Sequence, residues 1–312
     1  MQGSFASETL TAEEGFRIIS EARQAVDMPI LASVGVLGRD HDKTIETALQ
    51  MVAAGADMVH FDLFYLDQPR SSDEALESLA ELFALAAREL KVPFGPKLNN
   101  DIPAHRFVQR FGSDAFGGVF LLDSIRVPPP LDHSGTSKIP YLSGATECSL
   151  FGPWQKPLTL QYTKVFAAAM KSDICAGGGL QNADDICEAL IHGAACVQIA
   201  TQIIVHGYDW IRKTNDRLAA RLSKQGMPNI SALRGLASRV VEAEGAEHAQ
   251  PVRAVVHAEH CKPCGVCTRL AFCPFIDGGP NEIPTISDVC YGCGLCEIFC
   301  PQAGAIQMEP VT

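Results

Sequence analysis

Eight cysteines lie close together near the C-terminal end of the chain, where they could bind metal. They form two runs, "CKPCGVCTRLAFCP" and "CYGCGLCEIFCPQ", in which a C-x2-C-x2-C triplet is followed by a fourth cysteine before proline. A triplet at this spacing in a tight loop places three thiolates at corners of a cubane. The spacing therefore predicts two [4Fe-4S] clusters, with structural zinc or disulfides as the weaker alternatives.

The two runs resemble those of the two-cluster bacterial ferredoxins, over about residues 253–310. The resemblance implies that the fourth cysteine of each run ligates the other cluster. The implied ligands are Cys261, Cys264, Cys267 and Cys300 for one cluster, and Cys290, Cys293, Cys296 and Cys273 for the other. Five residues, rather than three, separate Cys267 from Cys273, which lengthens a loop without displacing a ligand.

Length and composition limit the class of protein that these cysteines belong to. The 312 residues are enough for one large and one small domain, and 47% of them are hydrophobic. A net charge of −11 argues against nucleic acid or an anionic membrane as the main partner. No apolar run approaches the roughly 20 residues of a membrane span. Twelve cysteines without a secretory signal predict a cytoplasmic protein in a reducing compartment.

Before the cysteine runs, short apolar segments alternate with amphipathic ones. Buried strands are expected over residues 29–36, 57–65, 92–98, 115–125, 173–179 and 195–204. Residues 42–55 and 71–90 place apolar side chains at helical spacing. Strands that alternate with helices predict an α/β fold with parallel strands, which is either a doubly wound sheet or a (β/α)8 barrel.

The last two strands favour the barrel. The glycines of residues 177–179 precede a helix that Asn182 is expected to cap and Gly193 to end. The next strand leads to Ala200 and Thr201. Two such loops in succession resemble the phosphate site that barrels build after strands 7 and 8, where backbone N–H groups and a helix N-terminus bind the anion.

Residues 28–225 resemble the FMN barrel of the class 1 dihydroorotate dehydrogenases. The matching stretches include "PILASVG", "AGADMVHFDL", "VPFGPKLNND", "FGPWQKPLTL" and "CAGGGLQNADDICEALIHGAACVQIATQIIVHGYDWI". A barrel followed by a two-cluster ferredoxin is similar to the C-terminal part of the dihydropyrimidine dehydrogenases. The resemblance implies an FMN-type TIM barrel over residues 1–240 and a small α+β ferredoxin domain over residues 241–312.

The resemblance also implies which residues bind FMN. The residues expected at its phosphate are Gly178, Gly179, Ala200 and Thr201. Lys97, at a strand end, would lie near the flavin ring, where a cation stabilises the anionic reduced form; the alternative is a solvated lysine. Gly152 would let the backbone approach the cofactor, and Ser33 would also lie near the ring.

Three family positions carry unexpected residues. Relatives end the strand that matches "HFDLFYLDQP" with Asn-x-Ser-Cys-Pro, and this chain has Asp62 in place of the asparagine and Tyr65 in place of the cysteine. Asp123 replaces a second substrate-binding asparagine. Ionised aspartate only accepts hydrogen bonds, whereas asparagine also donates, so a pyrimidine substrate is not expected. Tyr65, Asp62 and Lys97 are the catalytic candidates, although Tyr65 could instead pack beside the flavin.

The relatives also have two further β/α units before the strand at residues 29–36. About six strands are expected here, whereas a closed barrel of this class has eight. An open sheet would expose two edges, which proteins normally cover. Another chain, or another copy of this one, is therefore expected to complete the barrel.

The polar, proline-rich segment 126–151 is expected to be a lid or a cover over the barrel mouth. It contains His133, Tyr141 and Cys148, of which Cys148 is a candidate acid or base. The remaining cysteines are expected to be buried apolar thiols: Cys175, Cys187 and Cys196.

Together these features predict a flavin and iron–sulfur oxidoreductase subunit. It would exchange hydride between a small substrate and FMN, and pass electrons singly through two [4Fe-4S] clusters to a redox partner protein. The alternative is a non-catalytic electron-transfer or scaffold subunit, which the missing cysteine and the short front of the barrel favour.

Overall fold

The computed structural model describes residues 2–3, 11–36, 38–66, 72–139, 147–244, 251–269, 273–279 and 281–311. The chain divides into two compact units, Met1–Val240 and Val241–Thr312.

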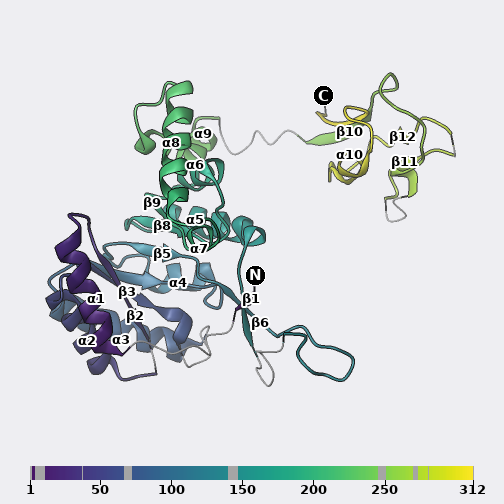
Figure 1. The fold of residues 1–312 in the computed structure, drawn as a ribbon. Coiled ribbons are helices and arrows are strands. Elements are labelled where there is room, and N and C mark those ends of the chain that lie inside the picture. Colours follow the sequence, from purple (N-terminus) through teal and green to yellow (C-terminus); the bar gives the residue numbers. More distant parts are fainter. Residues whose placement is uncertain are drawn as a thin grey trace. The chain divides into compact units, whose positions relative to one another are not determined.

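A parallel six-stranded sheet forms the centre of the first unit and curls into half a barrel (Figure 1). Its strands, in spatial order, are β2 (Leu31–Gly35), β3 (Met58–Asp62), β4 (Phe94–Lys97), β5 (Val119–Leu121), β8 (Ile174–Gly177) and β9 (Cys196–Gln198). All six expected strands are present in chain order. The sheet confirms the α/β prediction and is consistent with a TIM-like fold.

Helices connect these strands and cover the outer side of the sheet (Figure 1). They are α1 (Ala12–Ala25), α2 (His41–Ala53), α3 (Asp73–Glu89), α4 (Ala104–Phe111), α5 (Lys156–Ala169) and α6 (Ala183–Ile191). Asp40, Ser72 and Asn182 accept hydrogen bonds from first-turn amides and so begin α2, α3 and α6. The two helices expected over residues 42–55 and 71–90 are confirmed.

The main core lies between the sheet and these helices. Val59 and Phe61 of β3 are fully buried there, next to a phenylalanine cluster that includes Phe83, Phe107 and Phe166. Because successive strand residues point to opposite faces, the alternate residues of β3 face the inner side of the half barrel. Because Val59 and Phe61 point into this core, His60 and Asp62 face the inner side of the half barrel.

The strand expected over residues 195–204 is wrong at its C-terminal end. β9 stops at Gln198, and Thr201–His206 form helix α7, followed by α8 (Asp209–Lys224), a 3-10 turn at Ile230–Ala232 and α9 (Leu236–Glu244). The β-branched residues of this run favour a strand by propensity, but the Ala200 carbonyl accepts from the amides of Ile203 and Ile204. Local hydrogen bonding therefore overrides propensity at this position.

The segment expected to be a loop over residues 126–151 carries strands at both ends. β6 (Ile125–Val127) and β7 (Cys148–Leu150) form a small antiparallel sheet with β1 (Gln2–Gly3), in the order β1-β7-β6. His133 is exposed in the turn between them, and Tyr141 lies outside the described residues. A 3-10 turn at Pro153–Gln155 then leads into α5.

The second unit is small and mixes strands with short helices. β10 (Val252–Val256) pairs with β13 (Ile306–Pro310), and β11 (Ile276–Asp277) pairs with β12 (Thr285–Ile286), both antiparallel. A 3-10 turn at Cys267–Arg269 and helix α10 (Leu295–Phe299) complete it. Its core includes the side chains of Ala254, Cys267, Cys296 and Ile306.

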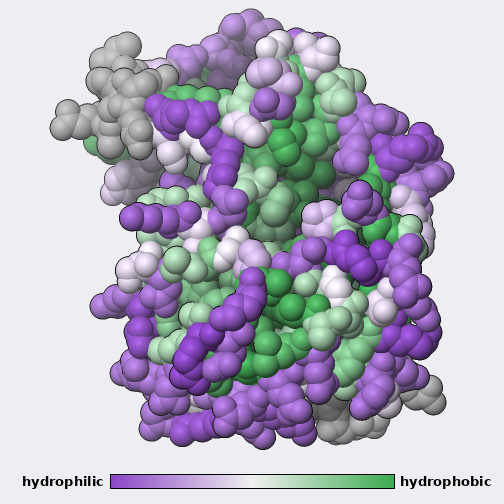
Figure 2. Space-filling model, turned by 90° about the vertical axis from the view of Figure 1, so that its left-hand side faces the viewer, coloured by the Kyte–Doolittle hydropathy of each residue, from purple (hydrophilic) through white to green (hydrophobic). Residues whose placement is uncertain are grey.

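Hydrophobic residues gather around a hollow on one face of the molecule, with hydrophilic residues around them (Figure 2). Within the described ranges, every helix is too short or too polar to cross a membrane.

Candidate functional site

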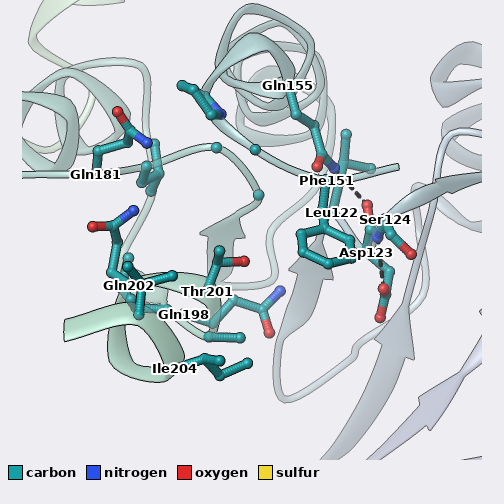
Figure 3. Close-up of a pocket in the computed structure, with 18 of the residues that line it drawn as sticks. Leu122, Asp123, Ser124, Phe151, Gln155, Gln181, Gln198, Thr201, Gln202 and Ile204 are labelled. Carbon is teal, nitrogen blue, oxygen red and sulfur yellow. Dashed lines mark hydrogen bonds between the residues drawn. The ribbon is translucent and has the colours of Figure 1, made fainter. Parts of the chain in front are cut away.

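A cavity of about 620 Å³ lies at the carboxyl ends of β4, β5, β8 and β9 (Figure 3). Its walls include the ends of these strands and the residues after them, which are Lys97 and residues 122–124, 178–181 and 198–202, together with residues 151–153 after β7. Functional residues of α/β barrels and sheets gather at this end of the strands. The volume lies within the range of small-molecule and cofactor sites, roughly 300–1,000 Å³.

The turn after β8 depends on two glycines. Gly178 and Gly179 have φ values of +89° and +82°, which L side chains rarely adopt. A Cβ atom on Gly179 would also lie 2.4 Å from the Lys156 backbone nitrogen, and one on Gly178 would lie 2.6 Å from Gln155 Nε2. The absence of side chains therefore lets this turn pack directly against the start of α5.

The helix that follows the glycine turn has its own caps. Asn182 Oδ1 accepts from the amides of Asp184 and Asp185 at 2.8 and 3.1 Å, and Asp185 Oδ2 accepts from the Gln181 amide at 2.8 Å. These amides and two first-turn carboxylates make the N-terminus of α6 a poor anion site, contrary to the expectation from sequence. In contrast, α7 begins at Thr201 without a side-chain cap. The backbone of the glycine turn and of the uncapped start of α7 borders the cavity.

An ion-pair cluster lies across the cavity, at the ends of β3, β4 and β5. Lys97 Nζ lies 2.9 Å from Asp62 Oδ2 and also pairs with Asp123 Oδ2. Asp62 and Lys97 are direct Cα partners of neighbouring strands. Only 7%, 18% and 24% of the Asp62, Lys97 and Asp123 side chains are exposed, so water screens these charges weakly.

The three groups influence one another's ionisation. Burial opposes the charge of Lys97, but the carboxylates of Asp123 and Asp62 outweigh it and raise the pKa of the ammonium. Burial also opposes ionisation of Asp123, but Lys97 and hydrogen bonds from Lys97 and Ser124 lower the pKa of that carboxyl. At Asp62 burial prevails, and together with repulsion from Asp123 it raises the pKa. The cluster therefore favours the charged forms of Lys97 and Asp123 and disfavours that of Asp62.

The two aspartates differ in their access to the cavity. Lys97 and Asp123 line it, whereas Asp62 lies behind Lys97. Asp62 Oδ1 accepts from the Phe64 amide at 3.1 Å and thereby begins the 3-10 turn Leu63–Tyr65. Asp123 Oδ1 accepts from the Ser124 amide at 2.6 Å, as Figure 3 shows. Asp62 is thus placed to position Lys97, and Asp123 to contact a ligand.

Other residues singled out in the sequence have different positions. Gly152 lines the cavity, together with Gly178, Gly179, Ala200 and Thr201. Ser33 is exposed on β2 beside His60 and is not among the described lining residues. The side chain of Tyr65 lies outside the described part of the structure.

Cys148 and Cys196 differ from their expected surroundings. Cys148 is buried in β7 rather than placed on a loop, so the expected position of this acid or base is wrong. Cys175 and Cys187 are buried, as predicted, but Cys196 is exposed on the edge strand β9.

Two glutamines of the cavity were not predicted. Gln198 Nε2 donates to the Leu121 carbonyl at 3.1 Å, and Gln155 Nε2 donates to the Asp123 carbonyl at 2.5 Å. Figure 3 shows Gln198 and Thr201 on one side of the cavity and Asp123 on the other. The position of Gln198 at a strand end was the available signal, because strand ends supply barrel site residues.

His60 was also missed, although its alternation with Asp62 on β3 places both on the inner face. Its ring packs against Phe120 with centroids 4.9 Å apart, and neither ring nitrogen has a hydrogen-bond partner among the described residues. Burial, with the nearby Lys97 charge, lowers the pKa of His60 to about 4. His60 is therefore neutral at physiological pH.

The eight clustered cysteines surround two cavities in the second unit. Around one lie Cys261, Cys264, Cys267 and Cys300, and around the other, of about 460 Å³, lie Cys273, Cys290, Cys293 and Cys296. These are the two groups that the ferredoxin resemblance implies. The first cavity encloses only about 10 Å³, so a cubane would enter only if its loops moved outward. In the described part of the chain, no three His, Cys, Asp or Glu side chains converge on a single-ion position.

Comparisons with known proteins find relatives among dehydrogenase subunits. No protein-family model matches the chain. Over 270 residues the chain is 23% identical to the NAD-dependent dihydropyrimidine dehydrogenase subunit PreA of Escherichia coli. The matched stretch covers 81% of this chain and 63% of PreA.

Two further matches are to the catalytic subunit of dihydroorotate dehydrogenase B (NAD(+)). The Methanopyrus kandleri protein is 28% identical over 190 residues, which make up 59% of this chain and 58% of that protein. The Enterococcus faecalis protein is 24% identical over 149 residues, which make up 48% and 45%. The chain thus spans less than two thirds of the length of each of these three relatives.

Proposed function

We propose that this chain, a divergent relative of the dihydroorotate and dihydropyrimidine dehydrogenases, is a flavin and iron–sulfur oxidoreductase subunit. It exchanges hydride between a small substrate and FMN in the first unit, and passes electrons singly through two [4Fe-4S] clusters in the second. The names of its relatives support a dehydrogenase. FMN, when bound, supplies the conversion between two-electron and one-electron transfer.

The single observation that carries the flavin assignment is the glycine turn opposite Lys97 in one cavity. Gly178, Gly179 and the start of α7 at Thr201 would hold the phosphate through backbone N–H groups. Gly152 would border the cofactor. A Cβ on Gly179 would collide with the Lys156 backbone nitrogen, so the turn keeps its place beside the cavity only with glycine at this position.

On the reacting side, Lys97 presents a permanent positive charge beside the ring. Asp62 fixes the ammonium from behind, and Asp123 faces the substrate as a hydrogen-bond acceptor. A pyrimidine carbonyl opposite that carboxylate would lack a donor, which costs roughly 1–3 kcal/mol for a buried group. We therefore propose a small substrate other than a pyrimidine. A role for Tyr65 stays a prediction.

The test of flavin binding is Gly179→Ala. The new Cβ would collide with the Lys156 backbone nitrogen at 2.4 Å, which displaces the turn that holds the phosphate. FMN retained after anaerobic purification, measured by absorbance and by mass spectrometry of the released cofactor, is expected to fall at least about tenfold.

Gly226→Ala is the matched control. Gly226 also has a positive φ, of +66°, but nothing lies within 4 Å of its Cβ position, so the change strains the backbone without filling a site. It is expected to retain FMN. Equal FMN content in the wild type and both variants, or no FMN in any of them, would overturn the flavin assignment.

The second unit supports the cluster assignment through its two groups of four cysteines. Each group combines three cysteines of one run with the fourth cysteine of the other, as in an interlocked pair of cubanes. Cys267 and Cys296 belong to the small core, and Cys290 and Cys300 pack against it, so the metal would be part of the folded structure.

A partner subunit or second copy is the remaining part of the proposal. β2 and β9 are the edges of the described sheet, and exposed apolar side chains lie near both. Met28 and Leu31 are 63% and 47% exposed at the β2 edge, and Ile204 and Tyr208 are 79% and 83% exposed after β9. If the purified protein is stable, monomeric and fully loaded with flavin, the proposal that a partner subunit or second copy completes the barrel is wrong.

A further inference from the structure

Two cysteines face each other on the inner side of the half barrel. Cys175 of β8 and Cys196 of β9 are direct Cα partners in neighbouring parallel strands. Their neighbours Ala176 and Val197 pack on the opposite face, against the core beneath α6, so both thiols point inward. Neighbouring strands lie about 4.8 Å apart, within the roughly 4.4–6.8 Å that separates the Cα atoms of disulfides.

The two thiols have different chemical surroundings. Cys175 is buried with 6% of its surface exposed, whereas Cys196 is exposed. The interaction between the two thiols raises the pKa of Cys175 and lowers the pKa of Cys196. Burial and Asp173 oppose the lowering at Cys196, and Arg234 supports it. Cys196 is thus the accessible nucleophile, and Cys175 is the buried resolving thiol behind it.

The pair also lies next to the candidate site. Two residues farther along the same strands are Gly177 and Gln198, which are again Cα partners, and Gln198 lines the cavity. Two strand residues span about 6.6 Å, so the thiols form the layer directly below the cavity floor. β8 then leads into Gly178, and β9 leads to Thr201.

We propose that Cys175 and Cys196 form a redox-active thiol pair, which closes to a disulfide by exchange with a small-molecule disulfide. The Cys196 thiolate attacks one oxidant sulfur, forms a mixed disulfide and releases one thiolate, which takes up a proton. Cys175 then loses its proton and its sulfur attacks the Cys196 sulfur, which releases the second thiol. The chain loses two electrons and two protons, and the oxidant becomes two thiols.

Closure would tie the edge strand β9 to β8 immediately before the two turns that border the cavity. The inference rests on strand register and exposure, and not on which cofactor the cavity binds.

The test uses the full chain, purified without oxygen so that any clusters stay intact. The protein is treated with oxidised glutathione, free thiols are blocked with iodoacetamide, and fragments are identified by mass spectrometry. Trypsin leaves the three cysteines between Lys171 and Arg212 on one fragment. Proteases that cut before aspartate and after glutamate separate them at Asp184, Asp185 and Glu188.

The expected product is a disulfide-linked pair of fragments that contain Cys175 and Cys196. Without oxidant, iodoacetamide should label Cys196 about tenfold faster than the buried Cys187. Both measurements use the wild-type chain, so they do not depend on whether a variant folds.

Variants then separate the two roles. Cys175→Ser should stop at a mixed disulfide on Cys196, Cys196→Ser should leave Cys175 unmodified, and Cys187→Ser should behave as the wild type. A wild-type mixed disulfide that never closes, or labelling of Cys196 no faster than of Cys187, would overturn the proposal. Wild-type protein that contains no FMN but still closes the pair would overturn the flavin assignment and leave this inference standing.

Discussion

Lys97 is held between the carboxylates of Asp62 and Asp123. The ammonium donates to Asp62 and pairs with Asp123, and all three side chains are mostly buried. Such a cluster contributes little net stability when intact, because desolvation offsets attraction, but removal of one member leaves the others unpaired. The ammonium is therefore the residue whose loss should matter most.

Lys97→Met is expected to lower the free energy of unfolding by about 3 kcal/mol at neutral pH, because it leaves two buried carboxylates without a cation. Urea denaturation followed by tryptophan fluorescence measures this change. Both tryptophans, Trp154 and Trp210, lie in the first unit, so the signal follows that unit.

Lys164→Met, on the exposed side of α5, is the control and should change stability by less than about 0.5 kcal/mol. If the two variants lose equal stability, the buried ion pairs of Lys97 do not contribute more to stability than an exposed lysine does.

His60 predicts a pH dependence of stability. Its pKa falls from 6.5 to about 4 on folding, so the unfolded chain binds more protons between these values. The stabilisation is complete above about pH 6.5 and is lost as pH falls towards 4, by roughly 3 kcal/mol at most. In His60→Gln, measured by denaturation at pH 4.5–7, stability should fall less with acidification than in the wild type.

The exposed His133 supplies the comparison. His133→Gln should retain the wild-type pH dependence, because water surrounds this ring in the folded state as well. A wild-type slope in His60→Gln would show that other groups cause the acid sensitivity.

At the scale of elements, α6 offers a clean test of capping. Asn182 Oδ1 accepts from two first-turn amides, so Asn182→Ala should destabilise the first unit by about 1 kcal/mol. Asn229 also precedes a helical turn but makes no capping bond, and Asn229→Ala should have no comparable effect. Thermal unfolding of the two variants side by side decides the matter, and equal midpoints would exclude the cap as the cause.

The strands and long helices could be predicted because their apolar residues repeat with a clear period. The end of β9 could not be predicted in this way, because Ile203, Ile204 and Val205 favour a strand by propensity. In the structure the amides of Ile203 and Ile204 donate to the Ala200 carbonyl and form a helical turn instead. The anion role of α6 was misjudged for a related reason. The sequence predicts the Asn182 cap, but the bond from the Gln181 amide to Asp185, which further satisfies this helix end, is seen only in the structure.

The site was partly predictable. Lys97, Gly152 and the glycine turn line the cavity, because each lies at a strand end or loop that the sequence identifies. The ion-pair cluster around Lys97 and the pair Cys175–Cys196 could not be predicted. Both depend on strand register, which brings together residues far apart in the chain. Register follows from how the hydrophobic patterns of neighbouring strands match, so the pattern of one strand alone does not identify its partner residues.

At the scale of the whole molecule, the eight cysteines predict a specific result for double variants. If the fourth cysteine of each run serves the other cluster, Cys261→Ser with Cys300→Ser damages one cluster only. Cys290→Ser with Cys300→Ser damages both. Iron and sulfide analysis of anaerobically purified protein should find about four irons in the first variant and almost none in the second.

The reverse result would mean that each run binds its own cluster. Cys187→Ser, in the first unit, controls for general effects of thiol removal and should keep all the iron of the wild type.

Gly95 and Gly118 allow two neighbouring strands to approach closely, and this limits which substitutions the sheet tolerates. A methyl group on Gly95 would lie 1.8 Å from the Gly118 carbonyl oxygen, so β4 and β5 approach as closely as two residues without side chains permit. Lys97 lies two residues beyond the first glycine, and Asp123 follows the strand of the second. Even alanine at residue 95 would therefore push β4 and β5 apart. That displacement would also separate Lys97 from Asp123 at the carboxyl ends of the two strands.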